Sequence, residues 1–99
     1  MGKKAGKQTY HFANPPIIIS TGTVAGPIED QGPLHAAFDE ILTDSRNNEK
    51  TFERAERSML IRACQLALDH ASCSTGEVDL FLAGDLLNQI ISANFTAAT

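Results

Sequence analysis

The chain has 99 residues, of which 42% are apolar and 20% are charged, and its formal net charge is −4 at pH 7. This composition is typical of a single small globular domain and is too apolar for a disordered chain. A protein that binds duplex nucleic acid needs a concentrated basic surface, whereas the eight basic residues here are spread from Lys3 to Arg62. We therefore expect no nucleic-acid partner.

Residues 1–13 are interpreted as a flexible basic N-terminal tail that carries Lys3, Lys4 and Lys7. A solvated tail is the simpler interpretation of these lysines, and a contact with anionic lipid is the alternative. No apolar run of signal-peptide or membrane-span length is found, and two cysteines are too few for a disulfide framework. These observations predict a cytoplasmic protein without a signal peptide or transmembrane segment.

The segment that follows the tail favours a buried β-strand. Asn14-Pro15-Pro16 forces an extended backbone, and the β-branched run Ile17–Ile19 is typical of a strand that is covered on both faces. Gly22 and Gly26-Pro27 mark the end of this strand.

A short helical segment is predicted next, because Pro33 suits a first helical turn and four apolar residues then fall on one helix face. These four are Leu34, Ala37, Phe38 and Ile41. The polar segment "TDSRNNEK", residues 43–50, is predicted to be a loop.

The strongest pattern in the sequence lies between Thr51 and Ala71, where apolar residues recur at steps of three and four. This spacing predicts an amphipathic helix with one buried face. The residues expected to be buried are Phe52, Met59, Leu60, Ala63, Cys64 and Ala67, and those expected to be exposed are Glu53, Arg57 and Arg62.

The last part of the chain, "VDLFLAGDLLNQIISANF", predicts a second buried strand over residues 78–83 and a further helix that begins at Asp85. Strand, helices, strand and helix in this order indicate an α/β fold, in which the two strands are parallel and joined by a right-handed crossover. Ligands of open parallel sheets bind at the carboxyl ends of the strands, and Gly84-Asp85 follows such an end.

Asp85, Asn88 and Gln89 are therefore the residues to weigh as a binding site. In the structural interpretation, Asp85 caps the helix and the two amides satisfy neighbouring backbone groups. A direct ligand contact is the alternative. Asp79, within the second strand, is interpreted as a marker of a strand start or an edge rather than as a catalytic acid.

The remaining candidates for chemistry form no known constellation. His11, His35 and His70 lie on three different elements, so we expect no metal site. Cys64 lies on the apolar helix face and Cys73 in a turn, and both are interpreted as structural. No phosphate-binding loop is present either. The sequence thus predicts no catalytic, cofactor-binding or metal-binding residue.

Three segments together resemble the stage V sporulation protein AD family of the thiolase-like superfamily: "NPPIIISTGTVAGPIEDQGPLHAAFDEI", "FERAERSMLIRACQLAL" and "LFLAGDLLNQIISANF". The resemblance implies a duplicated, five-layered α-β-α-β-α subunit that is several times longer than this chain. Residues 14–99 would then be the first part of its N-terminal half-domain, a truncated β-α-β-α opening.

The resemblance also implies a function. Members of the family are thought to bind dipicolinic acid and to help move it into the forming spore, together with other stage V sporulation membrane proteins. It further implies a cytoplasmic protein, or one held peripherally on the inner membrane of the spore, and a possible homodimer. The groups that bind dipicolinate would lie beyond Thr99.

The fold alone allows a second function, an acyl-thioester condensing enzyme related to thiolases and ketoacyl synthases. The nucleophilic cysteine of that superfamily lies beyond the matched region, so neither Cys64 nor Cys73 inherits its role. The resemblance favours the binding protein, and the enzyme question stays open, since the residues that would decide it, a Cys with two His or with His and Asn, would lie beyond Thr99.

Overall fold

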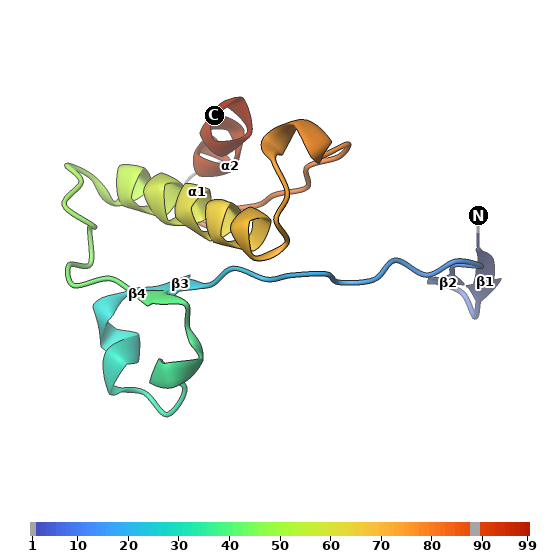
Figure 1. Ribbon diagram of the computed structural model, residues 1–99, viewed down its shortest axis with the longest axis horizontal. Helices are drawn as coiled ribbons and strands as arrows, with labels where there is room; N and C mark the ends of the chain where they lie inside the picture. Colours follow the sequence, from blue (N-terminus) through green and yellow to red (C-terminus); the bar gives the residue numbers. More distant parts are fainter. Residues whose placement is uncertain (1, 88–89) are drawn as a thin grey trace.

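A computed structural model describes residues 2–87 and 90–99. Its centre is the long helix α1 (Phe52–His70), with the short helix α2 (Ile91–Ala98) packed beside it (Figure 1). A long extended segment passes beneath α1 and leads back to an N-terminal hairpin. Small sheets and two α-helices make the protein a mixed α/β structure, which confirms the predicted class at this level.

Helix α1 forms where the apolar spacing predicted it, and both of its ends are capped. The Thr51 side chain accepts a hydrogen bond from the backbone N–H of Arg54 (3.2 Å), which satisfies one of the free donors of the first turn. At the other end Ser72 adopts a left-handed φ of 55°, and Cys73 N–H donates to the carbonyl oxygen of Leu68 (2.9 Å).

Helix α2 packs on α1 through small residues. Ala55 of α1 and Ala93 of α2 are buried, and small side chains at both positions let the two helices approach closely. Ser92, also buried, donates a hydrogen bond to Glu56 Oε1 (2.6 Å) and lies 3.3 Å from the carbonyl oxygen of Glu53. This contact therefore combines small apolar side chains with a polar link.

A two-stranded parallel pair lies next to α1. Strand β3 (Val24–Ala25) pairs with β4 (Glu40–Ile41), with Val24 opposite Glu40 and Ala25 opposite Ile41. Ala25 is buried, so this pair joins the small core. Two 3-10 helices, η1 (Pro27–Gln31) and η2 (His35–Ala37), connect the strands. The short helical segment predicted after Pro33 is thus confirmed only as the 3-10 turn η2, because Glu40 and Ile41 extend to pair with β3.

The two predicted buried strands are wrong. Residues 17–19 and 78–83 belong to no sheet, residues 78–83 include a bend at Asp79, and the large apolar side chains of both segments are exposed. The exposed fractions of Ile17, Ile18 and Ile19 are 83%, 85% and 74%, and those of Leu80 and Leu82 are 73% and 82%. β-Branched residues favour an extended backbone, but a strand forms only where a neighbour supplies hydrogen bonds. Neither segment has such a neighbour here.

The apolar face of α1 is placed only in part as predicted. Phe52 is exposed, the other five residues expected to be buried are half-buried, and the buried residue of α1 is Ala55. Glu53, Arg57 and Arg62, which were expected to be exposed, are partly covered. The Arg57 guanidinium lies 4.8 Å from the centre of the Phe95 ring, because α2 packs on the side of α1 that carries Glu53 and Arg57. Periodicity located the helix but not the partner that covers it.

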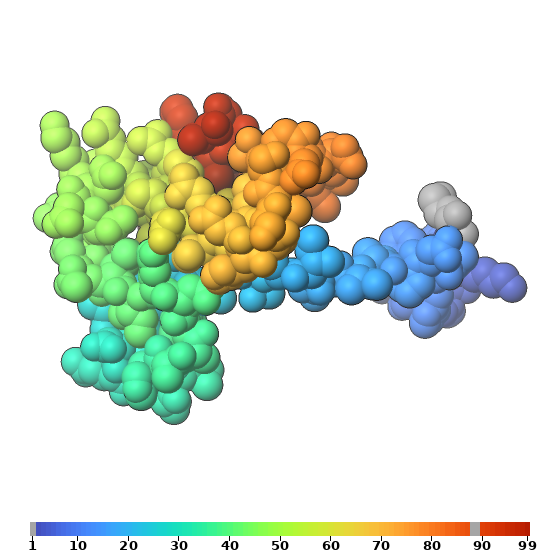
Figure 2. Space-filling model, in the orientation of Figure 1, coloured from blue at the N-terminus to red at the C-terminus, as the bar shows by residue number. Residues whose placement is uncertain are grey.

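The N-terminal residues form a hairpin that the sequence did not predict. Strand β1 (Lys3–Ala5) pairs antiparallel with β2 (Thr9–His11), and Gly6 in the turn has a φ of 71°. Glycine accepts this left-handed conformation without steric cost. The hairpin stands at the far end of the extended segment, away from the helices (Figure 2).

Candidate functional site

The predicted site at Gly84-Asp85 is occupied by a helix cap. The Asp85 carboxylate accepts hydrogen bonds from the backbone N–H groups of Ile90 (3.1 Å) and Ala93 (2.8 Å), one through each oxygen. Asp85 therefore caps α2 as the structural interpretation expected, but the helix begins at Ile91 rather than at Asp85 itself. Asn88 and Gln89 lie outside the described residues.

The backbone next to this cap is strained. Ile90 has a φ of 65°, a left-handed conformation that β-branched residues rarely adopt. Asp85 holds the Ile90 N–H in place, and the carbonyl oxygen of Ile90 accepts from Asn94 N–H (3.1 Å) as the first bond of the helix. Both carboxylate oxygens are thus engaged in structure, and a negative charge at this point disfavours an anionic ligand.

A groove lies between α1, the C-terminal end of α2 and residues 75–81. Its volume is about 460 Å³. Leu68 and Phe81 supply apolar surface, and Thr75 and Thr99 belong to the polar lining. Among the described residues that line the groove, Asp79 is the only charged one. A dianion needs cations or several convergent N–H donors, so this groove suits an apolar group better than a dicarboxylate.

Cys64 also lines this groove, and its environment does not activate it. Burial raises the pKa of the Cys64 thiol above its ordinary value, because the charged thiolate loses its hydration. A thiol with a raised pKa is protonated at neutral pH and is a poor nucleophile. The structure therefore gives Cys64 the inert character that its position on the helix predicted.

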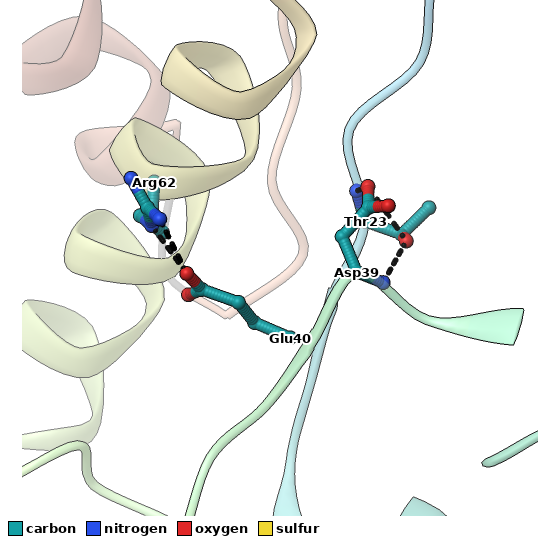
Figure 3. A network of polar contacts seen from close by, with 4 residues as sticks. All are labelled: Thr23, Asp39, Glu40 and Arg62. Carbon is teal, nitrogen blue, oxygen red and sulfur yellow. Dashed lines mark hydrogen bonds and ion pairs between the residues drawn. The ribbon is translucent and has the colours of Figure 1, made fainter. Parts of the chain in front are cut away.

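A polar network ties the parallel strand pair together and to α1 (Figure 3). Thr23 and Asp39 bind each other reciprocally: Thr23 N–H donates to Asp39 Oδ2 (2.8 Å), and Asp39 N–H donates to Thr23 Oγ1 (2.9 Å). Next to them Arg62 donates to Glu40 Oε1 through Nε (2.7 Å) and Nη2 (2.5 Å). This network is structural, since each charged group already has a partner.

The Glu40–Arg62 pair changes the titration of both groups. Hydrogen bonding to Arg62 holds the pKa of Glu40 below its ordinary value, and the same bond raises the pKa of Arg62. Sequence reasoning missed this pair because Glu40 was assigned to a helix and lies 22 residues from Arg62. No local spacing signals a contact over such a distance.

The three histidines lie apart, and two of them contact backbone carbonyl groups. His70 Nδ1 lies 2.8 Å from the carbonyl oxygen of Thr21, and His35 Nδ1 lies 3.0 Å from that of Gly32. In residues 2–87 and 90–99, no three His, Cys, Asp or Glu side chains are grouped so that they could hold a metal ion. The same residues include no helix that is long and apolar enough to cross a membrane.

Comparison with known proteins assigns the chain to a family. The sequence profile of the family described as stage V sporulation protein AD matches residues 6–99, which is nearly the whole chain. The chain belongs to the stage V sporulation protein AD family.

A curated member of this family gives the extent of the match. Stage V sporulation protein AD of Bacillus subtilis (strain 168) is 43% identical to the chain over 95 residues. The alignment covers 96% of the chain but 28% of the Bacillus protein. The chain thus spans less than a third of the length of this relative.

Proposed function

We propose that the protein acts in stage V of spore formation, where it binds dipicolinic acid and assists its uptake into the developing spore. The observation that carries this proposal is membership of the stage V sporulation protein AD family, with 43% identity to the Bacillus subtilis member. Other stage V sporulation membrane proteins are the proposed partners, and a homodimer is the proposed assembly.

Residues 1–99 contribute structure to this function rather than the ligand site. Dipicolinate carries two carboxylates, and the groove beside Cys64 has one charged lining residue, the acidic Asp79. The Asp85 carboxylate is likewise negative and engaged with α2. We therefore propose that the groups that bind the dianion lie in regions of the family that residues 1–99 do not cover, and that they are cations or convergent N–H donors.

The exposed extended segments support a thiolase-like sheet in the intact protein. Ile17–Ile19 and residues 80–82 are extended, apolar and open to solvent. Edges with unpaired N–H and C=O groups favour pairing with further strands, and the Bacillus subtilis relative is long enough to supply them. We propose that residues 14–99 form the first part of an N-terminal thiolase-like half-domain.

The alternative function, acyl-thioester condensation, finds less support in these residues. It requires an activated cysteine, and neither Cys64 nor Cys73 corresponds to the nucleophile of that superfamily. A binding and uptake role needs no such group. We therefore propose a non-enzymatic protein that resides in the cytoplasm or peripherally on the inner membrane of the spore.

Complementation tests this function. The intact protein is expressed in Bacillus subtilis that lacks its own stage V sporulation protein AD, and the dipicolinate content of purified spores is measured. We expect the content to be restored, compared with an empty-vector control. Normal protein levels without any gain in spore dipicolinate would contradict the proposed uptake role.

A further inference from the structure

Charge is unevenly divided along this chain. Lys3, Lys4 and Lys7 all lie in the N-terminal hairpin or its turn, and no acidic residue precedes Glu29. Residues 29–99 hold all twelve acidic residues and five of the eight basic ones, a formal charge of −7. The hairpin is therefore the cationic part of an otherwise acidic chain.

The hairpin is also set apart in space. The extended segment over residues 12–23 separates it from the two α-helices, and in the space-filling view it projects from the rest of the molecule (Figure 2). All the residues of the two strands are exposed except Ala5, which is partly covered. Its side chains are thus available to a large, flat partner.

Two exposed aromatic residues accompany the lysines. The register places Lys4 opposite Tyr10, with Lys4 Nζ 6.0 Å from the centre of the Tyr10 ring. Phe12 follows β2 directly, two residues after Tyr10. The exposed fractions of Tyr10 and Phe12 are 63% and 57%. Tyrosine beside a cation is a combination typical of the headgroup region of membranes.

We propose that this hairpin binds the surface of a membrane that contains anionic lipids. An anionic bilayer matches both features, because the lysines meet lipid phosphates while the rings of Tyr10 and Phe12 enter the headgroup region. The acidic residues 29–99 are repelled by the same surface, which turns the hairpin toward it. The proposal extends the peripheral membrane location put forward above and does not depend on dipicolinate binding.

The charges of the three lysines set the expected affinity of the hairpin for an anionic membrane. Each lysine near an anionic surface contributes about a five-fold gain in partitioning, so the three together contribute about a hundred-fold. Such binding is reversible and weakens with salt, because the charges remain exposed to solvent.

Vesicle co-sedimentation of the intact protein tests the proposal, in the absence of dipicolinate. The vesicles contain phosphatidylglycerol and phosphatidylcholine, or phosphatidylcholine alone. We expect binding only to the anionic vesicles, and a loss of about a hundred-fold in the variant with Lys3→Gln, Lys4→Gln and Lys7→Gln. The variant with Lys3→Arg, Lys4→Arg and Lys7→Arg keeps the charge and should retain binding.

A matched control variant separates the effect of the charge on the hairpin from the effect of the net charge of the protein. The variant with Arg46→Gln, Lys50→Gln and Arg54→Gln removes the same charge from three exposed residues outside the hairpin, and should bind nearly as well as the parent. Equal losses in both neutralised variants would overturn the proposal, as would equal binding to neutral vesicles. Unchanged vesicle binding by the variant with Lys3→Gln, Lys4→Gln and Lys7→Gln would also overturn it.

Discussion

A Cβ atom on Gly22 would stand 2.2 Å from the carbonyl oxygen of Ala63 in helix α1. It would also lie 2.6 Å from the backbone nitrogen of Ala67. The extended segment therefore crosses α1 at a point where only glycine fits. Beside it the Ser20 hydroxyl donates to the carbonyl oxygen of Ala67 (2.6 Å), which fixes the crossing.

Gly22→Ala should therefore destabilise the intact protein by about 1–3 kcal/mol, the usual cost of overpacking against atoms that cannot move aside. Thermal or denaturant unfolding measures the loss. Gly26→Ala is the matched control, because a Cβ there meets nothing within 4 Å and φ is −74°. Equal stability of the two variants would show that the crossing is looser than described.

Asp85→Ala should cost about 0.5–2 kcal/mol, because it removes the cap of α2 at the N–H groups of Ile90 and Ala93. Asp85→Asn keeps an acceptor oxygen and should lose less. Asp79→Ala, at an exposed aspartate, serves as the control. If Asp85→Ala and Asp79→Ala unfold at the same temperature, the capping role of Asp85 is refuted.

The Glu40–Arg62 pair should make stability depend on acid pH. Arg62 lowers the pKa of Glu40 in the folded protein, so the stabilisation is fully present above the ordinary value of 4.5. It disappears as the pH falls through the lowered pKa. The difference in melting temperature between the parent and Glu40→Gln should therefore be present at neutral pH and vanish in acid.

Because this ion pair is only partly covered from solvent, the difference should be small and should also shrink at high salt. A melting-temperature difference that stays constant from neutral to strongly acid pH would contradict the assigned role. Asp30→Asn, which removes one exposed negative charge outside the pair, is a control for the change in net charge.

Cys64 should react slowly with thiol reagents. Burial raises its pKa above the ordinary value of 9.0, so the thiolate fraction at neutral pH is low. The pH dependence of alkylation, measured by mass spectrometry in a Cys73→Ser variant, should show a midpoint above that value. A midpoint near neutrality would instead indicate an activated thiol and would contradict the inert, buried character assigned to Cys64.

The sequence predicted those parts of the fold that depend on local spacing. Helix α1 was correctly located because its apolar residues repeat at helical steps and Thr51 can cap it. The capping role of Asp85 was also foreseen, because aspartate before a helix accepts from free N–H groups. The exact start of α2 at Ile91 was missed by six residues.

The predictions that were wrong concern segments whose burial depends on residues distant in the sequence. The sequence of Ile17–Ile19 predicted a buried strand. Burial of such a strand requires neighbouring strands, and residues 2–87 and 90–99 provide none for this segment. The predicted solvent face of α1 was partly wrong because α2 places Phe95 over Arg57. Periodicity along one helix carries no information about which distant segment packs on it.

In the candidate site, too, local features could be predicted from the sequence and contacts between distant segments could not. Its chemistry at Asp85 could be argued from neighbouring residues, whereas the groove beside Cys64 arises from segments that meet only in three dimensions. Thr99 and Thr75 carried no signal in the sequence that placed them in one groove with Cys64.

Calorimetric titration of dipicolinate tests the central claim most directly. It is carried out on the intact protein and on residues 1–99 alone, with hydrogen exchange on both. We predict saturable binding by the intact protein and none by residues 1–99, whose exposed Ile17–Ile19 and residues 80–82 should exchange rapidly. Absence of binding by the intact protein would contradict the proposed function, and saturable binding by residues 1–99 would contradict the placement of the ligand site outside them.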